Sequence, residues 1–172
     1  MSPAAPLRTI SVGVVVERAK GATVWADFVW RPVGVLAGAP ATAPWTKLSD
    51  DGDRATFYAG AAEIELYRSE TGNYRHNLVS GAPAVWVVLR ATGDEPPYAI
   101  AAATVDPAEG ESFTEAGSDT IEAVPMPAAI YEVVAAFVAE HHVETSFVKR
   151  ERDRADPQAL ARRLPRGDDD RA

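Results

Sequence analysis

The densest group of chemically active side chains lies near the C-terminal end of the sequence, in AEHHVETSFVKRERDR, residues 139–154. His141 and His142 are adjacent, and neighbours on a helix point about 100° apart. Two histidines that bind one metal ion from a helix are spaced i, i+3 or i, i+4, as in H-E-x-x-H. The spacing therefore predicts that His141 completes an apolar helix stripe. His142 is then expected to be exposed at the helix end, where it complements the helix dipole.

Two glutamates at alternate positions are the second candidate for chemistry. Glu63 and Glu65 share one face of an expected strand, and a period of two places them roughly 6.5–7 Å apart. Some paired-acid glycosidases use a similar separation. Alternating glutamates on an exposed strand are more often simply solvated, and nothing else in the sequence builds a sugar site. Paired-acid catalysis is therefore the weakest of the readings that we keep.

Other routes to catalysis lack their residues. The chain contains no cysteine, which excludes thiol nucleophiles, disulfides and cysteine-ligated metals. No serine lies in a G-x-S-x-G motif, and neither G-x-x-x-x-G-K-[ST] nor G-x-G-x-x-G occurs. We therefore expect a protein without catalytic residues, cofactor or metal.

Three tryptophans, Trp25, Trp30 and Trp45, are candidates for the lining of a ligand groove. Aromatic side chains are common in small-molecule pockets. Their more common use is to pack in a core or to anchor a loop. The sequence leaves both readings open.

Short apolar runs separated by turn residues predict an antiparallel meander. Residues 84–89 (AVWVVL) are apolar at every position, so we expect a central strand that is buried on both faces. Pro32 cannot donate to a strand ladder, and its strand should lie at an edge or carry a bulge. Residues 71–73 predict a hairpin turn, and residues 106–111 a further turn. Strands are expected at residues 10–17, 24–35, 45–48, 56–59, 63–68, 74–79, 84–89 and 98–105.

One segment has helical periodicity. In residues 126–142 the apolar side chains recur at i, i+3, i+4, i+7 and i+8, which predicts an amphipathic helix. We expect its apolar stripe to cover the strand at residues 84–89. The predicted fold class is therefore α+β: a mainly antiparallel, strongly curved or barrel-like β-meander with one long helix packed on it.

The length of 172 residues predicts one domain with flanking segments. We expect a frayed N-terminus at residues 1–9, a globular domain at 10–148 and a charged, largely flexible C-terminal arm at 149–172. The net charge is −8, and because the arm carries +2, the rest carries −10. An acidic body argues against nucleic-acid binding. The apolar run at residues 12–16 is too short for a signal peptide or a membrane span, so we expect a cytoplasmic protein without membrane contact.

Three stretches carry a resemblance to a known family: VWADFVWRPVGVLAG (24–38), EAVPMP (122–127) and FVAEHHVETSFVKRERDR (137–154). In these stretches the chain resembles a bacterial family of uncharacterised domains, and the resemblance extends from about Ile10 to Arg163. Members are often mislabelled molybdopterin-guanine dinucleotide biosynthesis protein A. They are commonly encoded beside molybdenum-dependent formate dehydrogenase and its accessory proteins. The resemblance implies a role in making or using that dehydrogenase.

The guanylyltransferase label does not fit these residues. Guanylyltransferases that attach GMP to molybdopterin carry an L-x-G-G-x-S-x-R-M-G loop. Residues 10–22 (ISVGVVVERAKGA) have one glycine after the first strand and no Gly-Gly-x-Ser. Nucleotide transfer of that kind also uses a parallel α/β sheet, whereas the strands expected here are antiparallel. We therefore reject the enzyme label.

The C-terminal segment is then interpreted as a docking arm. Phe147 offers an apolar anchor, and a basic cluster follows at Lys149, Arg150, Arg152 and Arg154. Burial of the anchor supplies affinity, and the cationic flank steers association. The competing reading is that Phe147 packs on the body and that the charges stay solvated.

The leading hypothesis is a non-enzymatic accessory protein for the maturation or assembly of a molybdenum-dependent formate dehydrogenase. It would bind a subunit of that enzyme or one of its accessory proteins. The alternative is a small-molecule or molybdenum-cofactor-binding module that uses the tryptophan-lined groove.

Overall fold

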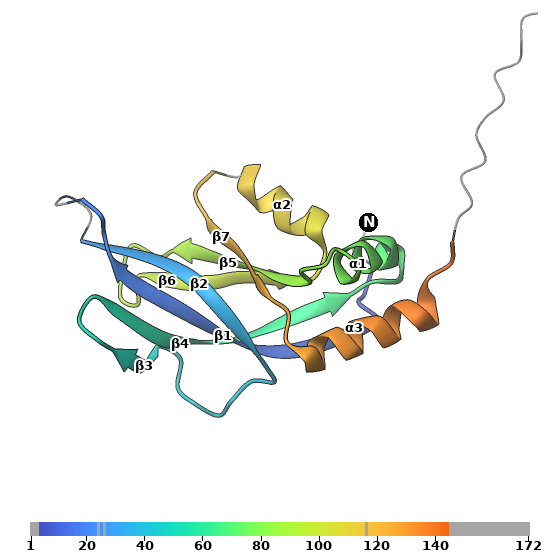
Figure 1. The fold of residues 1–172 in the computed structure, drawn as a ribbon, viewed down its shortest axis with the longest axis horizontal. Helices are drawn as coiled ribbons and strands as arrows, with labels where there is room; N and C mark the ends of the chain where they lie inside the picture. Colours follow the sequence, from blue (N-terminus) through green and yellow to red (C-terminus); the bar gives the residue numbers. More distant parts are fainter. Residues whose placement is uncertain (1–3, 24, 26, 116, 145–172) are drawn as a thin grey trace, which may run out of the picture. The chain divides into compact units, whose positions relative to one another are not determined.

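The computed structural model describes residues 4–23, 25, 27–115 and 117–144 (Figure 1). The chain divides into two units after His142, and the elements below belong to the first unit. Within the described residues there are seven strands, three α-helices and one short 3-10 turn. In chain order they are β1 (Arg8–Lys20), β2 (Phe28–Ala37), β3 (Thr46–Asp50), β4 (Arg54–Leu66), the 3-10 turn η1 (Arg68–Glu70), α1 (Thr71–Leu78), β5 (Ala84–Ala91), β6 (Tyr98–Thr104), α2 (Pro107–Glu115), β7 (Thr120–Pro125) and α3 (Ala128–His141).

The first sheet has four antiparallel strands in the order β2-β1-β4-β3. Val12, Val14 and Val16 of β1 alternate at period two and are fully buried, as expected of a strand with one face in a core. The prediction for Pro32 is confirmed. Its strand β2 lies at an edge of the sheet, and the register of β2 with β1 shifts beside this proline.

Strand β4 is continuous where the sequence predicts two strands. Gly60 has a φ of 132°, a backbone conformation that residues with a Cβ rarely adopt. The register of β4 with β1 shifts at the same place, since Val14 pairs with Gly60 and Val15 with Tyr58. A bulge therefore bends the strand without ending it. The meander prediction is also wrong here, because β4 pairs with β1, which is distant in sequence.

The second sheet has the order β6-β5-β7, also antiparallel. The prediction of a doubly buried central strand at residues 84–89 is confirmed. Val85, Val87 and Leu89 belong to the core shared with the first sheet, while Val88 is buried on the other face of β5. Because both faces of β5 are buried, its sequence does not alternate between apolar and polar residues.

The two sheets are not closed into a barrel, so the barrel-like prediction is wrong. Their apolar faces pack together, and buried side chains of α1 and α3 complete the core. The rings of Tyr74 on α1 and Phe137 on α3 have centroids 6.2 Å apart. The prediction of a single helix is also wrong, since the described chain has three.

Helix α1 occupies residues for which the sequence predicts a hairpin turn and a strand. Thr71, Tyr74 and Asn77 are buried at a spacing of three, which is helical and not strand periodicity. The Asn77 amide donates to the carbonyl oxygens of Ala84 (2.8 Å) and Val105 (2.9 Å). These tertiary contacts decide the local structure, because a polar segment that contains glycine has only a weak preference of its own.

Helix α2 likewise replaces a predicted turn. Asp106 Oδ1 accepts hydrogen bonds from the backbone N–H groups of Ala108 (2.9 Å) and Glu109 (3.3 Å), and Pro107 is the first helical residue. This is the arrangement of an N-cap followed by proline. Helix α2 packs on β5, whereas α3 packs chiefly on α1 (Figure 1). The prediction that α3 covers β5 is therefore wrong, because the outer face of β5 is covered by α2.

None of the described helices combines the length and the apolar character that crossing a membrane would require. The predicted arm at residues 149–172 lies outside the described residues. The domain boundaries and the cytoplasmic location stay predictions.

Candidate functional site

The five predicted partner-binding residues lie outside the described residues. They are Phe147, Lys149, Arg150, Arg152 and Arg154. Their role stays a prediction, and the site described below is built from other side chains.

The predicted tryptophan set is divided by the structure. Trp25 is 94% exposed and makes no ring contact with another described residue. Trp30 and Trp45 lie edge to face with centroids 6.0 Å apart. Phe57 lies 5.4 Å from Trp30, and Tyr98 of the second sheet lies 6.2 Å from it. The half-buried aromatic cluster around Trp30 thus joins one end of the two sheets.

Arg18 packs over this aromatic cluster. Its guanidinium carbon lies 4.5 Å from the ring centroid of Phe28, 5.8 Å from that of Trp30 and 5.5 Å from that of Phe57. Nε of Arg18 is buried and has no hydrogen-bond partner in the described structure. Cation–π attraction to several rings replaces part of the lost hydration.

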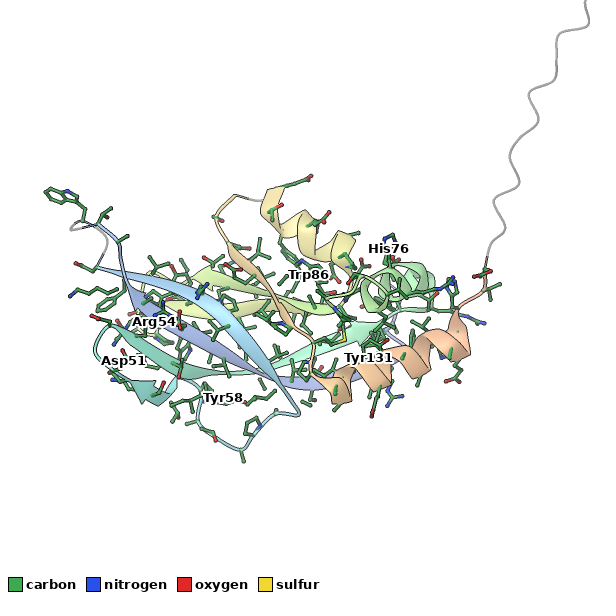
Figure 2. All side chains as sticks on the ribbon, viewed as in Figure 1. Asp51, Arg54, Tyr58, His76, Trp86 and Tyr131 are labelled. Atoms are coloured by element: carbon green, nitrogen blue, oxygen red, sulfur yellow. The ribbon has the colours of Figure 1, made fainter. Side chains whose placement is uncertain are left out.

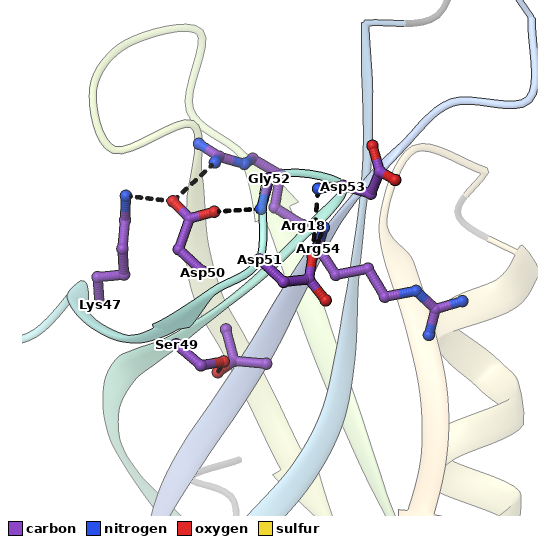
Figure 3. Close-up of polar contacts among 9 residues, drawn as sticks. Arg18, Lys47, Ser49, Asp50, Asp51, Gly52, Asp53 and Arg54 are labelled. Atoms are coloured by element: carbon purple, nitrogen blue, oxygen red, sulfur yellow. Dashed lines mark hydrogen bonds and ion pairs between the residues drawn. The ribbon is translucent and has the colours of Figure 1, made fainter.

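Asp50 lies between two cations at the same end of the first sheet (Figure 3). Its carboxylate accepts a hydrogen bond from Lys47 Nζ at 2.7 Å and lies 3.9 Å from Arg18 Nη2. The hydrogen bond from Lys47 and a second from the backbone of Gly52 lower the pKa of Asp50. The next acid, Asp51, accepts from backbone N–H groups of its own turn. These acids are therefore occupied in forming the turn.

A separate cavity of about 420 Å³ lies where β4, the 3-10 turn, α1 and the start of α2 meet. We name it the Tyr67 cavity. Among the described residues, its polar lining consists of carboxylates, one amide and two hydroxyls. The lining residues are Ala4, Tyr67, Ser69, Glu70, Asn73, Asp106, Ala108 and Glu109.

The carboxylates of this cavity are held in place by a hydrogen-bond network. Asp106 is only 4% exposed, and its Oδ2 accepts from Asn73 Nδ2 at 3.1 Å. The same Asn73 nitrogen donates to Glu70 Oε2 at 3.2 Å. Glu109 accepts from the hydroxyl of Thr104 at 2.6 Å. The half-buried Asn73, with its amide nitrogen donating to both carboxylates, holds two acids that lie on different segments.

The acids of this cavity contribute to the raised pKa values of two tyrosines. The Tyr74 hydroxyl accepts a hydrogen bond from the backbone N–H of Tyr67. Burial raises the pKa of Tyr74 to about 12, and the charges of Asp106, Glu70 and Glu109 add to this effect. The pKa of Tyr67 is also raised, first by its hydrogen bond to Glu65 and then by burial. Nearby anions disfavour the phenolate. The same anions would favour a bound cation.

One sequence signal for this site was available. Asp106-Pro107-Ala108-Glu109 is an N-cap residue, a proline at the first helical position and a glutamate two residues later, a pattern typical of a helix start. No signal in the sequence links it to Tyr67 or Asn73, because these residues meet only in the folded chain.

The two adjacent histidines face different neighbours, as the spacing predicts. The His141 ring lies 4.6 Å from the Phe137 ring, which agrees with its predicted place at the end of the apolar stripe. Nδ1 of His142 lies 3.1 Å from the hydroxyl of Thr71, so this ring is half buried and not fully exposed. The described residues contain no group of three His, Cys, Asp or Glu side chains arranged to hold a metal ion.

Glu63 and Glu65 are both exposed on β4. Glu65 accepts a hydrogen bond from the hydroxyl of Tyr67, whereas Glu63 makes no hydrogen bond or ion pair with another described residue. Paired-acid catalysis stays a prediction.

A comparison with known protein families matches residues 11–151 to the family described as "Protein of unknown function (DUF3305)". The match confirms the expectation of an uncharacterised family, while the label and the gene neighbourhood stay predictions. No curated protein and no solved structure matches the chain.

Proposed function

Because the chain belongs to the DUF3305 family, whose function is unknown, we propose from its own residues that it is a non-enzymatic accessory protein that binds another protein. The proposed partner is a subunit of molybdenum-dependent formate dehydrogenase or one of its accessory proteins, during maturation or assembly. The sequence resemblance supports the identity of the partner. The Tyr67 cavity supports the mode of binding.

The uncompensated charge of this cavity carries the proposal. Glu70, Asp106 and Glu109 line the cavity, and none of them forms an ion pair with a Lys, Arg or His within the described residues. A guanidinium or ammonium group from a partner would form charge-assisted hydrogen bonds with these acids. The volume of about 420 Å³ leaves room for such a side chain.

The arm would make a second contact of opposite charge. Phe147 and the basic residues Lys149, Arg150, Arg152 and Arg154 follow the acidic body. The acidic cavity would bind a basic side chain of the partner, and the basic arm would bind acidic side chains of it. The proposed partner surface therefore carries both kinds of charge.

The test measures the affinity of purified formate dehydrogenase components for four forms of the protein. The cavity variant is Glu70→Gln with Glu109→Gln, and its matched control is Glu63→Gln with Glu132→Gln, which removes two exposed charges elsewhere. The fourth form ends at Val148. We expect the cavity variant to bind at least about tenfold more weakly and the control to bind as the wild type does.

Each result has a distinct meaning. Full affinity in the cavity variant would remove the Tyr67 cavity from the interface, and full affinity in the truncated form would remove the arm. If no component of the dehydrogenase binds the folded wild-type protein, the proposed partner is wrong.

A second candidate function uses the aromatic cluster around Trp30. Trp30 and Trp45 are half buried and in contact, and the guanidinium of Arg18 lies over Trp30. This combination suits a planar, anionic small molecule such as a molybdenum-cofactor precursor. Quenching of tryptophan fluorescence by such a precursor or by a nucleotide, lost in Trp30→Phe, would support this function. An unchanged spectrum across these ligands with folded protein would contradict it.

A further inference from the structure

The turn between β3 and β4 contains the one Asp-Gly peptide of the sequence, formed by Asp51 and Gly52, and the sequence has no Asn-Gly. All residues from Asp50 to Arg54 are exposed. Gly52 has a φ of 94°, and a Cβ placed there would meet no other described atom within 4 Å. Because glycine has no side chain, its backbone nitrogen is sterically open to a reaction with the carboxyl group of the preceding aspartate.

Asp50 provides a base beside this nitrogen (Figure 3). Its Oδ1 accepts a hydrogen bond from the backbone N–H of Gly52 at 2.9 Å. Its Oδ2 accepts from Lys47 Nζ at 2.7 Å, and these two hydrogen bonds lower the pKa of Asp50, so its carboxyl group is ionised at neutral pH. A carboxylate within hydrogen-bond distance of the proton to be removed meets the geometric requirement for a general base.

Two backbone N–H groups face the carboxyl group that would be attacked. Oδ1 of Asp51 accepts from the N–H of Arg54 at 2.8 Å and from the N–H of Asp53 at 3.1 Å. Attack on Cγ of Asp51 shifts negative charge onto a carboxyl oxygen, and donors fixed beside such an oxygen stabilise that charge. Residues 50–54 therefore hold a nucleophile, a base and two donors for an oxyanion.

We propose that Asp51 and Gly52 form a cyclic imide spontaneously in the folded protein and that Asp51 is thereby converted to isoaspartate. The Gly52 nitrogen bonds to Cγ of the protonated Asp51 carboxyl group, and its proton passes to Asp50. Oδ2 of Asp51 leaves as water, with the carboxyl proton and the proton that Asp50 returns.

Water then opens the imide in one of two ways. Cleavage of the bond between the nitrogen and Cγ restores aspartate, and cleavage of the bond between the nitrogen and the main-chain carbonyl carbon gives isoaspartate. One water leaves and one enters, so the reaction needs no oxidant, reductant or cofactor. The exposure of the turn supplies the water.

The product changes the turn and its contacts. In isoaspartate the main chain runs through the side chain, so the turn gains one backbone methylene. Asp50, whose carboxylate lies 3.9 Å from Nη2 of Arg18, should then shift relative to the aromatic cluster around Trp30. This reaction takes place within the chain and does not depend on the proposed partner.

The experiment incubates the full chain near neutral pH in water labelled with heavy oxygen and maps residue 51 by peptide mass spectrometry. Each hydrolysis of the imide introduces one labelled oxygen atom, and fragmentation that distinguishes the two linkages identifies isoaspartate. The reference is a synthetic peptide of residues 47–57, which has the same Asp-Gly sequence without the fold. We expect label to enter the folded chain at least about threefold faster, because only the fold fixes the base and the donors.

Variants of the full chain test the assigned roles. Asp50→Asn keeps an oxygen that can accept from Gly52 but removes the base, and it should slow the uptake of label about threefold or more. Asp53→Asn removes a neighbouring carboxylate of the same turn and should leave the rate within about twofold. Asp51→Glu should suppress the reaction, because its imide ring would be one atom larger.

Two outcomes would overturn the proposal. One is uptake of label in the folded wild type that is no faster than in the peptide, a comparison that needs no variant to fold. The other is an unchanged rate in folded Asp50→Asn. In either case the hydrogen bonds of the turn would protect the Asp-Gly peptide and not promote its reaction.

Discussion

Gly110 of α2 packs so closely on Trp86 of β5 that a Cβ at position 110 would lie 2.3 Å from Cγ of the indole. Trp86 lies between β5 and α2 (Figure 2), so this contact sets how near the helix can approach the sheet. Asp106 caps the same helix, and Glu109 lies in its first turn. The contact therefore also positions one wall of the Tyr67 cavity.

We expect Gly110→Ala to destabilise the protein. The new methyl group overlaps the indole, and relief requires that α2 or Trp86 move, at a cost of about 1–3 kcal/mol in the free energy of unfolding. Gly72→Ala in α1 is the matched control, because a Cβ there meets no atom within 4 Å and alanine favours a helix by about 0.5–1 kcal/mol. Denaturant unfolding measures both. Equal effects in the two variants would contradict the close approach.

Asn77 is expected to be the most sensitive polar residue of α1. It is 3% exposed, its amide donates to two carbonyl oxygens, and its Oδ1 accepts from the N–H of Ala84 at 3.0 Å. Asn77→Ala removes the side-chain partner of one buried and two partly buried backbone groups, and we expect a loss of about 3 kcal/mol or more. Asn73→Ala, whose partners are carboxylates at the edge of a cavity, should cost about 1 kcal/mol. Chemical denaturation of the two variants distinguishes them, and equal losses would be inconsistent with the network around Asn77.

The strands were more predictable than the helices, for reasons visible in particular residues. β5 is apolar at every buried position, so composition alone marks a central strand. α1 was missed because its sequence, TGNYRHNL, contains few apolar residues and the burial of Asn77 depends on carbonyl groups of β5 and of the segment after β6. α2 was missed although its Asp-Pro start is a recognisable cap.

The candidate site was beyond prediction for a different reason. The Tyr67 cavity combines Ala4 with residues 67–73 and residues 106–109, and only the pairing of β1 with β4 and the docking of α2 bring these segments together. Two of the three tryptophans predicted to line a groove do meet in the fold. Trp30 and Trp45 meet because β2 and the start of β3 lie at the same end of the first sheet, whereas Trp25 lies in the loop beyond β1 and points into solvent.

The raised pKa of the Tyr74 hydroxyl predicts that the folded protein loses stability at alkaline pH. Burial raises its pKa from 10.0 to about 12 in the folded protein, while the unfolded chain ionises near 10. Between about pH 10 and about pH 12 the unfolded state has released the proton and the folded state has not, so stability falls as the pH rises. Below this pH window both states keep the proton, and the Tyr74 hydroxyl makes its full contribution to stability.

Stepwise unfolding from neutral to alkaline pH measures the effect, with Tyr74→Phe as the reference. The variant loses the hydrogen bond from the backbone N–H of Tyr67 to the Tyr74 hydroxyl (3.0 Å), which should cost about 1 kcal/mol at neutral pH. The stability difference between wild type and variant should then shrink or reverse across the window. A constant difference would show that Tyr74 ionises at the same pH in both states.

Arg18 offers a test of the aromatic cluster that is independent of any ligand. Its side chain is 24% exposed, its Nε lacks a partner, and its ion pair with Asp50 is long at 3.9 Å. A half-buried cation of this kind gains from the rings but retains part of its desolvation cost.

Arg18→Met keeps a long apolar chain over the rings and removes the charge. We expect a change in unfolding free energy within about 1 kcal/mol, together with a change in tryptophan emission because Trp30 loses its cation. Arg54→Met on the exposed side of β4 should leave the emission unchanged. A loss well above this range in Arg18→Met would mean that the guanidinium, and not its hydrocarbon stem, holds this end of the two sheets together.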